Sequence, residues 1–183
     1  MKYALLHTKL NRPSVTPDIV PRDRLIKRLE QGRKRPLTLI SAAAGYGKST
    51  LSSRWVAGCD YPNAWVSLEE SDSDLHIFLS YVLSANRRLF PGTEIRTEAI
   101  LETSQMHPAA DLARHLLNDL HQISEPFNLV LDDYHRIQRG SPVNDLLDEF
   151  LAHPPRGMHL VLLTRQDPSL PIATMRGRGL VTE

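Results

Sequence analysis

Short, largely apolar runs alternate with segments of helical spacing along this chain. The runs cover residues 37–40, 64–68, 127–131 and 158–163. Runs of this length and composition are typical of strands that are buried on both faces of a parallel sheet. Because segments with helical periodicity separate them, the pattern predicts a three-layer α/β domain with a mainly parallel sheet flanked by helices.

Apolar side chains recur at helical spacing between these runs. Two helices are predicted near the start, around residues 25–29 with an end near Gly32, and over residues 49–57. Three amphipathic helices are predicted from the apolar positions in 75–83, 112–123 and 143–151. Residues 91–107 are polar and open on a Pro-Gly pair, so they predict a long connection with at most one helical turn. Three prolines in residues 8–21 predict an extended lead-in.

Composition adds little to this picture. The 183 residues are 41% apolar and 23% charged, as in ordinary globular domains, and no apolar run is long enough to span a bilayer. The start lacks the apolar segment and cleavage site of a signal peptide, and the single cysteine, Cys59, cannot form an internal disulfide. We therefore expect a cytoplasmic protein with no membrane partner.

Charge is distributed unevenly, although the formal net charge is only +1. Residues 1–36 hold ten Lys and Arg against three Asp and Glu, whereas residues 37–183 hold twelve against eighteen. The basic first segment could meet phosphates or an acidic partner, or it could form a solvated face.

The loop after the first predicted strand has the residues that phosphate binding needs. The eight residues that begin at Ala42 match G-x-x-x-x-G-K-[ST], with alanine in place of the first glycine. Gly45 and Gly47 would let backbone N–H groups turn toward a β-phosphate. Lys48 would reach the β and γ oxygens, and the Ser49 hydroxyl would bind Mg²⁺.

A second strand ends in two carboxylates. Residues 128–133 form an apolar strand closed by Asp132 and Asp133, which is the Walker B pattern. Asp132 would hold Mg²⁺, usually through a water, and Asp133 would polarise the attacking water. An acidic turn after a strand is the alternative interpretation of the same pair.

Arg165 follows the last of the four predicted strands. An arginine at the carboxyl end of a parallel strand points into the crevice where ligands of such sheets bind, so it could sense a γ-phosphate. A surface arginine paired with Asp167 is the alternative.

Six segments, in this order, resemble a known family. They read T-K-L-x-R-P, V-P-R-D-R-L, A-x-A-G-Y-G-K-S, W-V-S-L-E-E-S-D, L-V-L-D-D-Y-H and L-L-T-R. Together they resemble the nucleotide-binding domain of MalT-like LuxR-type regulators, which are STAND-class signalling ATPases. The resemblance runs from about Thr8 to Gly179, and alanine at position 42 and Tyr46 are usual in that family.

The resemblance implies roles for individual residues. Catalysis would involve Asp133, Lys48 and Arg165, while Ser49 and Asp132 would hold Mg²⁺. Val20 and Arg22 would lie on the adenine side. The residues expected to contact ATP or ADP are Ala44, Gly45, Tyr46, Gly47, Lys48, Ser49, Thr50, Val20 and Arg22.

The resemblance also implies an organisation and a function. Residues 1–21 would be a basic lead-in, and residues 22–183 would be a P-loop NTPase domain at the N-terminal end of a larger regulator with sensor and helix-turn-helix domains. We expect a switch driven by ATP and ADP, with slow Mg²⁺-dependent hydrolysis, nucleotide-dependent self-association and no sequence-specific DNA binding by this part. Two alternatives stay open. One is a helicase-like DNA-dependent ATPase, because residues 132–135 resemble a D-E-x-H box, and the other is a module that only binds ADP.

Overall fold

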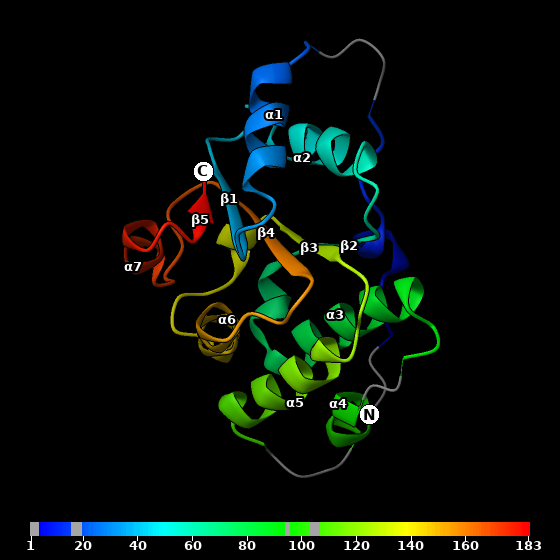
Figure 1. Cartoon of the computed structure of the whole chain (residues 1–183). Helices are drawn as coiled ribbons and strands as arrows, with labels where there is room; N and C mark the ends of the chain where they lie inside the picture. The colour runs from blue at the N-terminus through cyan, green and yellow to red at the C-terminus, as the bar shows by residue number, and fades with distance from the viewer. Residues whose placement is uncertain (1–3, 16–19, 94–95, 103–106) are drawn as a thin grey trace.

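A parallel sheet of five strands lies at the centre of the domain. The computed structural model describes residues 4–15, 20–93, 96–102 and 107–183. The strand order is β2-β3-β4-β1-β5, and all neighbouring strands run parallel (Figure 1). The strands are β1 (Leu37–Ser41), β2 (Asn63–Ser67), β3 (Phe127–Asp132), β4 (Met158–Thr164) and β5 (Val181–Thr182). The predicted fold class is therefore confirmed, as are the four predicted strands.

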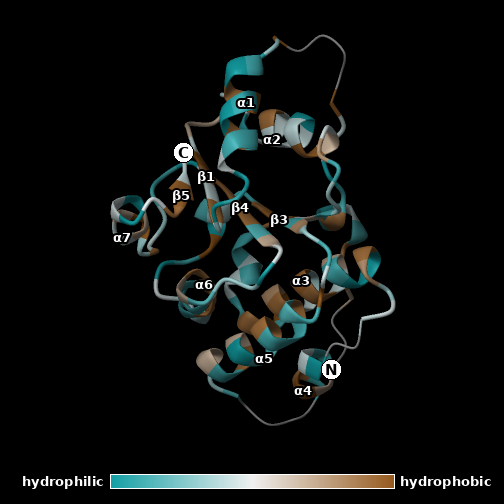
Figure 2. Ribbon diagram, viewed as in Figure 1, coloured by the Kyte–Doolittle hydropathy of each residue, from teal (hydrophilic) through white to brown (hydrophobic). Residues whose placement is uncertain are grey.

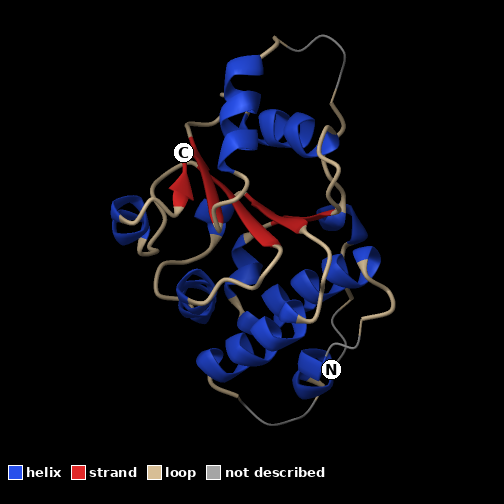
Figure 3. Cartoon of the chain, in the orientation of Figure 1, coloured by secondary structure: helices blue, strands red, loops and turns tan. Residues whose placement is uncertain are grey.

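Helices connect these strands and cover both faces of the sheet (Figure 3). The α-helices are α1 (Asp23–Gly32), α2 (Lys48–Ala57), α3 (Leu75–Leu89), α4 (Arg96–Leu101), α5 (Ala109–His121), α6 (Pro142–Ala152) and α7 (Ile172–Gly177). The 3₁₀ turns are η1 (His7–Leu10), η2 (Glu70–Ser73) and η3 (Tyr134–Arg136). The five predicted helices are confirmed as α1, α2, α3, α5 and α6. Helix α4 is the helical turn expected within residues 91–107, of which 94–95 and 103–106 lie outside the described residues, and α7 was not predicted.

Alternating side chains of the strands fill a separate core on each face of the sheet. Leu160 and Leu162 of β4 belong to the larger core, which the apolar faces of α3, α5 and α6 complete (Figure 2). Val161 and Leu163 belong to a smaller core with Trp55 of α2 and residues of α1. The sheet is thus buried on both faces, which explains why its strands are nearly continuous apolar runs.

The lead-in departs from the extended segment that the sequence predicts, and part of it is not the solvated face that was one interpretation of its charge. Residues 7–10 form the η1 turn, and the Lys9 side chain is only 6% exposed. Lys9 Nζ contacts Asp72 Oδ1 at 2.7 Å and lies 4.1 Å from the centre of the Tyr81 ring. Arg12 Nη1 donates a hydrogen bond to the Ser53 carbonyl oxygen at 2.9 Å. These two cations of the basic segment therefore bind the body of the domain itself.

Candidate functional site

The phosphate-loop motif occupies the turn between β1 and α2. Gly45 and Gly47 have φ angles of 80° and 76°, in the left-handed region that a residue with a Cβ rarely adopts. Gly47 is also the N-cap of α2, so the free backbone N–H groups of the first helical turn face the loop. The structure therefore places the motif at the strand-to-helix junction that the sequence predicts, where a helix N-terminus favours an anion.

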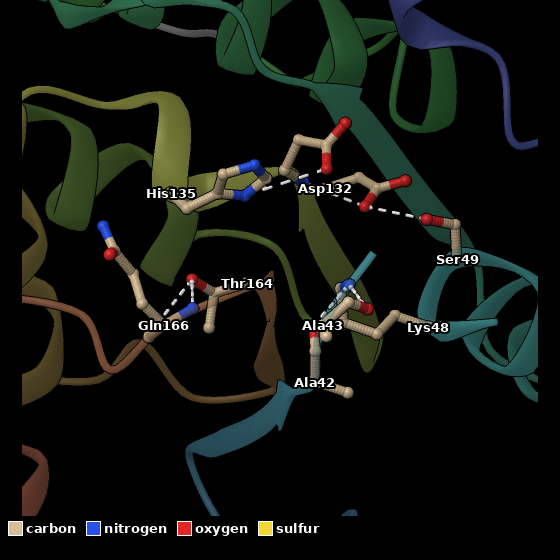
Figure 4. A network of polar contacts seen from close by, with 9 residues as sticks. Ala42, Ala43, Lys48, Ser49, Asp132, His135, Thr164 and Gln166 are labelled. Carbon is tan, nitrogen blue, oxygen red and sulfur yellow. Dashed lines mark hydrogen bonds and ion pairs between the residues drawn. The ribbon is translucent and has the colours of Figure 1, made fainter. Parts of the chain in front are cut away.

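The Lys48 side chain folds back onto this loop. Its Nζ donates hydrogen bonds to the carbonyl oxygens of Ala42 at 2.7 Å and Ala43 at 3.0 Å (Figure 4). The side chain is buried, so its ammonium group is held at the loop by backbone carbonyls. Phosphate oxygens would provide charged acceptors in place of these neutral ones.

The Walker A serine and the first Walker B aspartate are in direct contact. Ser49 Oγ donates a hydrogen bond to Asp132 Oδ1 at 3.0 Å, although 83 positions separate the two residues (Figure 4). Asp132 ends β3, which β4 separates from β1 in the sheet. The pKa of the Asp132 carboxyl group is raised, chiefly because burial penalises the charged form. The hydrogen bond from Ser49 lowers this pKa, and the neighbouring Asp133 charge raises it further.

This pair fits a Mg²⁺ site. A hydroxyl and a carboxylate are ligands of the hard, oxygen-bound type that Mg²⁺ accepts alongside substrate phosphates. A cation next to Asp132 would also offset the burial that raises the pKa of its carboxyl group. Within the described ranges no group of three or more His, Cys, Asp and Glu side chains is placed to hold a metal, so phosphate oxygens and water would complete this coordination.

Asp133 has an unusual backbone conformation. Its φ and ψ are 57° and 37°, and it is the sole non-glycine residue with positive φ in the described part of the chain. Aspartate tolerates this region better than most residues, and such conformations concentrate at functional sites. A cavity of about 450 Å³ opens beside Asp133 and is also lined by Glu69 and Arg136, so water has access to this carboxylate.

His135 lies beside Asp133 at this site, although the sequence singles it out only as the last residue of a helicase-like box. Its Nδ1 lies 3.8 Å from Asp133 Oδ1 and is buried without a hydrogen-bond partner. Burial lowers the pKa of His135, opposed by Asp133 and assisted by the charges of Arg165, Arg136 and Lys48. Its position two residues after Asp133, in the turn that follows the strand, was the signal available in the sequence.

Arg165 lies at the carboxyl end of β4, between the strands that carry the two motifs. Because β4 lies between β1 and β3, Arg165 follows the strand that separates the phosphate-loop strand from the Walker B strand. Arg165 is exposed and forms no ion pair with Asp167 or with any other residue that the structure describes. Its guanidinium is therefore not held by a protein carboxylate.

Of the residues expected on the adenine side, Arg22 lines a cavity next to the phosphate loop and Val20 does not. Arg22, the N-cap of α1, donates a hydrogen bond from Nη1 to the Tyr46 carbonyl oxygen at 2.9 Å. Arg22 and Tyr46 line a cavity of about 280 Å³ together with Leu25, Lys48 and other residues, which suits a small ligand. Val20 is 74% exposed and does not line this cavity, so its adenine contact stays a prediction.

The strand order, the loop-to-helix junction and the strand that ends in Asp132 define a domain with the P-loop ATPase fold. A Walker-type ATPase of Pyrococcus abyssi is similar in structure, with a TM-score of 0.55 and 15% identity over 87% of this chain and 49% of that one. A STAND protein with a tetratricopeptide repeat sensor from Pyrococcus horikoshii gives a TM-score of 0.51 and 18% identity, over 88% of this chain and 22% of that one. At these identities the likeness shows the fold alone.

The amino-acid sequence points to more particular relatives. The chain is 37% identical over 183 residues to the HTH-type transcriptional regulator MalT of Serratia proteamaculans, and 36% identical over 180 residues to MalT of Yersinia pestis. Each match covers 98% of this chain, which confirms the resemblance to MalT-like regulators, but the chain spans only 20% of the relatives' length. No protein-family model matches the chain. None of the described helices has the length and apolar character needed to cross a membrane.

Proposed function

We propose that this domain is an ATP- and ADP-binding switch with slow Mg²⁺-dependent hydrolysis, serving a transcription regulator of the MalT type. The observation that carries the proposal is the 3.0 Å contact between Ser49 Oγ and Asp132 Oδ1, which joins the two motifs at one point. The P-loop ATPase fold and the MalT relatives support the coarser conclusion, a nucleotide-binding regulatory domain.

The nucleotide binds first through its phosphates. The N-terminus of α2 and the loop N–H groups hold the β-phosphate, and Lys48 exchanges its two carbonyl acceptors for charged phosphate oxygens. Ser49 and Asp132 would hold Mg²⁺, and the bound ion would neutralise part of the β- and γ-phosphate charge. The cavity beside Arg22 and Tyr46 receives the base.

Hydrolysis then depends on Asp133 and its neighbour. The left-handed turn at Asp133 sets its carboxylate beside a water-accessible cavity, where it orients the attacking water. His135, neutral because burial lowers its pKa, lies beside the same carboxylate, with its Nδ1 3.8 Å from Asp133 Oδ1.

The switch distinguishes ATP from ADP through Arg165, because Arg165 reaches only the terminal phosphate, whereas the loop already holds the β-phosphate that both nucleotides share. In the whole regulator, the ATP form and the ADP form favour different arrangements of the downstream sensor and helix-turn-helix domains, and the ATP form self-associates. A cytoplasmic location belongs to the same proposal.

Lysine replacement tests nucleotide binding directly. Lys48→Ala removes the ammonium at the phosphate loop. Lys34→Ala removes an exposed lysine from the turn between α1 and β1, at the amino-terminal end of β1 and so away from the loop. We expect calorimetric titration with ATP and ADP to show loss of tight binding for the first variant alone, with both variants folded by circular dichroism. Equal affinity of Lys48→Ala and the parent for both nucleotides would rule out the phosphate-loop assignment.

The nucleotide carried by the purified domain tests the switch. Denaturation of one sample should release ADP or ATP. A second, native sample that is given ATP and Mg²⁺ should release phosphate slowly. We expect the same rate with and without DNA. A rate that rises with DNA would favour the helicase-like alternative, and bound ADP without any phosphate release would favour the binding-only module.

A further inference from the structure

Thr164, the last residue of β4, connects the phosphate loop to Arg165. It is fully buried and pairs in register with Ser41, the last residue of β1. Its carbonyl oxygen accepts a hydrogen bond from the N–H of Ala42 at 3.2 Å. The main chain just before Arg165 is thus bonded to the first residue of the phosphate loop.

The Thr164 hydroxyl makes a second, local connection. Oγ1 donates a hydrogen bond to the Gln166 carbonyl oxygen at 2.7 Å and accepts one from the Gln166 N–H at 3.4 Å (Figure 4). These bonds bridge Arg165, so they fix the backbone from which its side chain leaves. Threonine suits this role because its branched Cβ leaves few rotamers, and burial restricts them further.

Nothing else in the described part of the chain anchors the Arg165 side chain. It forms no ion pair there, so the backbone at Arg165 sets only the point and direction from which this exposed side chain starts. The charge of Arg165 is nevertheless felt at His135, where it helps to lower the pKa after the larger effect of burial.

We propose that Thr164 is the positioning residue for Arg165, and that the preference for ATP over ADP depends on a hydroxyl that touches neither nucleotide. The turn held by this hydroxyl directs the guanidinium to the terminal phosphate, and the Thr164 carbonyl holds the turn at a fixed place beside the loop. This proposal rests on the proposed function, since it requires a site that binds both nucleotides.

The test compares variants that separate the hydroxyl from the volume of the side chain. Thr164→Val keeps the shape and removes the hydroxyl, whereas Thr164→Ser keeps the hydroxyl. Thr38→Val is the matched control, because Thr38 is equally buried in β1 and its Oγ1 bonds His159 Nε2 at 2.9 Å, away from the site. For each protein, calorimetry gives the Kd of ADP and of a non-hydrolysable ATP analogue with Mg²⁺, and a thermal melt gives Tm.

We expect Thr164→Val to lose about tenfold in affinity for the ATP analogue, the size of one charge-assisted contact, with ADP affinity within about twofold of the parent. Thr164→Ser should keep the parental ratio. Thr38→Val should lower Tm without changing the ratio of the two affinities. If Thr164→Val does not fold, Thr164→Ala and Thr164→Ser form the second pair, since they differ only by the hydroxyl.

A double variant separates positioning from a merely structural role. In an Arg165→Ala background, Thr164→Val should cost no further affinity for the ATP analogue, because the group that it positions is gone. Additive losses, an unchanged ratio in Thr164→Val, or an equal change in Thr38→Val would overturn the proposal. A parent that binds neither nucleotide would instead overturn the proposed function, so the two failures are distinguishable.

Discussion

Replacing Lys9 by methionine removes the cation of a buried ion pair but keeps most of the apolar length of the side chain. Lys9 is 6% exposed and Asp72 is fully buried, with Lys9 Nζ at 2.7 Å and 2.5 Å from the two carboxylate oxygens. Without the ammonium, the Asp72 carboxylate keeps a single hydrogen-bond donor among the described residues, the N–H of Glu69 at 2.7 Å. Breaking one half of such a pair costs about 3–5 kcal/mol.

Urea denaturation measures this loss as a change in the free energy of unfolding. We expect Lys9→Met to lose about 3 kcal/mol or more at low salt and nearly as much in high salt, because buried pairs are weakly screened. Lys34→Met, which changes an exposed lysine in the same way, should stay within about 0.5 kcal/mol of the parent. A loss below about 1 kcal/mol that vanishes in salt would show that Lys9 belongs to a solvated basic arm after all.

Three further predictions concern the site and the sheet. Arg165→Ala should weaken ATP-analogue binding about ten- to hundredfold in calorimetry and leave ADP binding nearly unchanged. Arg156→Ala, at the amino-terminal end of β4, should affect neither nucleotide. A proportional loss for both nucleotides in Arg165→Ala would refute the sensor role. Asp132→Asn should weaken the Mg²⁺ dependence of ATP binding, whereas Asp133→Asn should bind ATP and release phosphate more slowly; equal loss of binding in both would contradict this division. Burial lowers the pKa of His159 to about 4, below the ordinary value of 6.5 that the unfolded state keeps. As the pH falls, the unfolded state therefore takes up a proton on His159 before the folded state does. Stability should fall by about 2–3 kcal/mol as pH drops from about 6.5 to about 4, and His159→Gln should flatten this slope in denaturation curves; an unaltered slope would mean that other groups cause it.

The residues of the phosphate loop could be predicted from the sequence because the chemistry requires fixed residue types at fixed spacing. The two motifs each assign a ligand to one Mg²⁺, so Ser49 and Asp132 were expected close together, but their direct hydrogen bond depends on the order of strands in the sheet and not on local pattern. In the sheet, β4 lies between β1 and β3, so the ends of β1 and β3 are not adjacent and the side chains that follow them must reach across β4.

The burial of Lys9 escaped prediction for a different reason. A lysine in a basic, proline-containing segment is usually solvated, and its partner Asp72 lies 63 positions further along the chain. The left-handed backbone of Asp133 was equally invisible, because a run of two aspartates after a strand gives no indication of φ. Both features arise from tertiary contacts that local composition does not encode.

The site gains its geometry from the core beneath it. Asp132 and Thr164 end strands whose preceding residues, such as Val130 and Leu162, are buried on one or the other face of the sheet. A slip of one residue along either strand would turn buried side chains to the opposite face, so the packing fixes the position at which each strand ends. The groups proposed to act on a nucleotide lie at the strand ends or in the turns directly after them. Glycines shape the turn after β1, the left-handed Asp133 shapes the turn after β3, and the Thr164 hydroxyl holds the turn after β4. A substitution at a buried strand position before these ends should therefore change nucleotide binding only as far as it lowers stability, whereas one at Asp132, at Thr164 or in the adjoining turn changes binding while the fold persists.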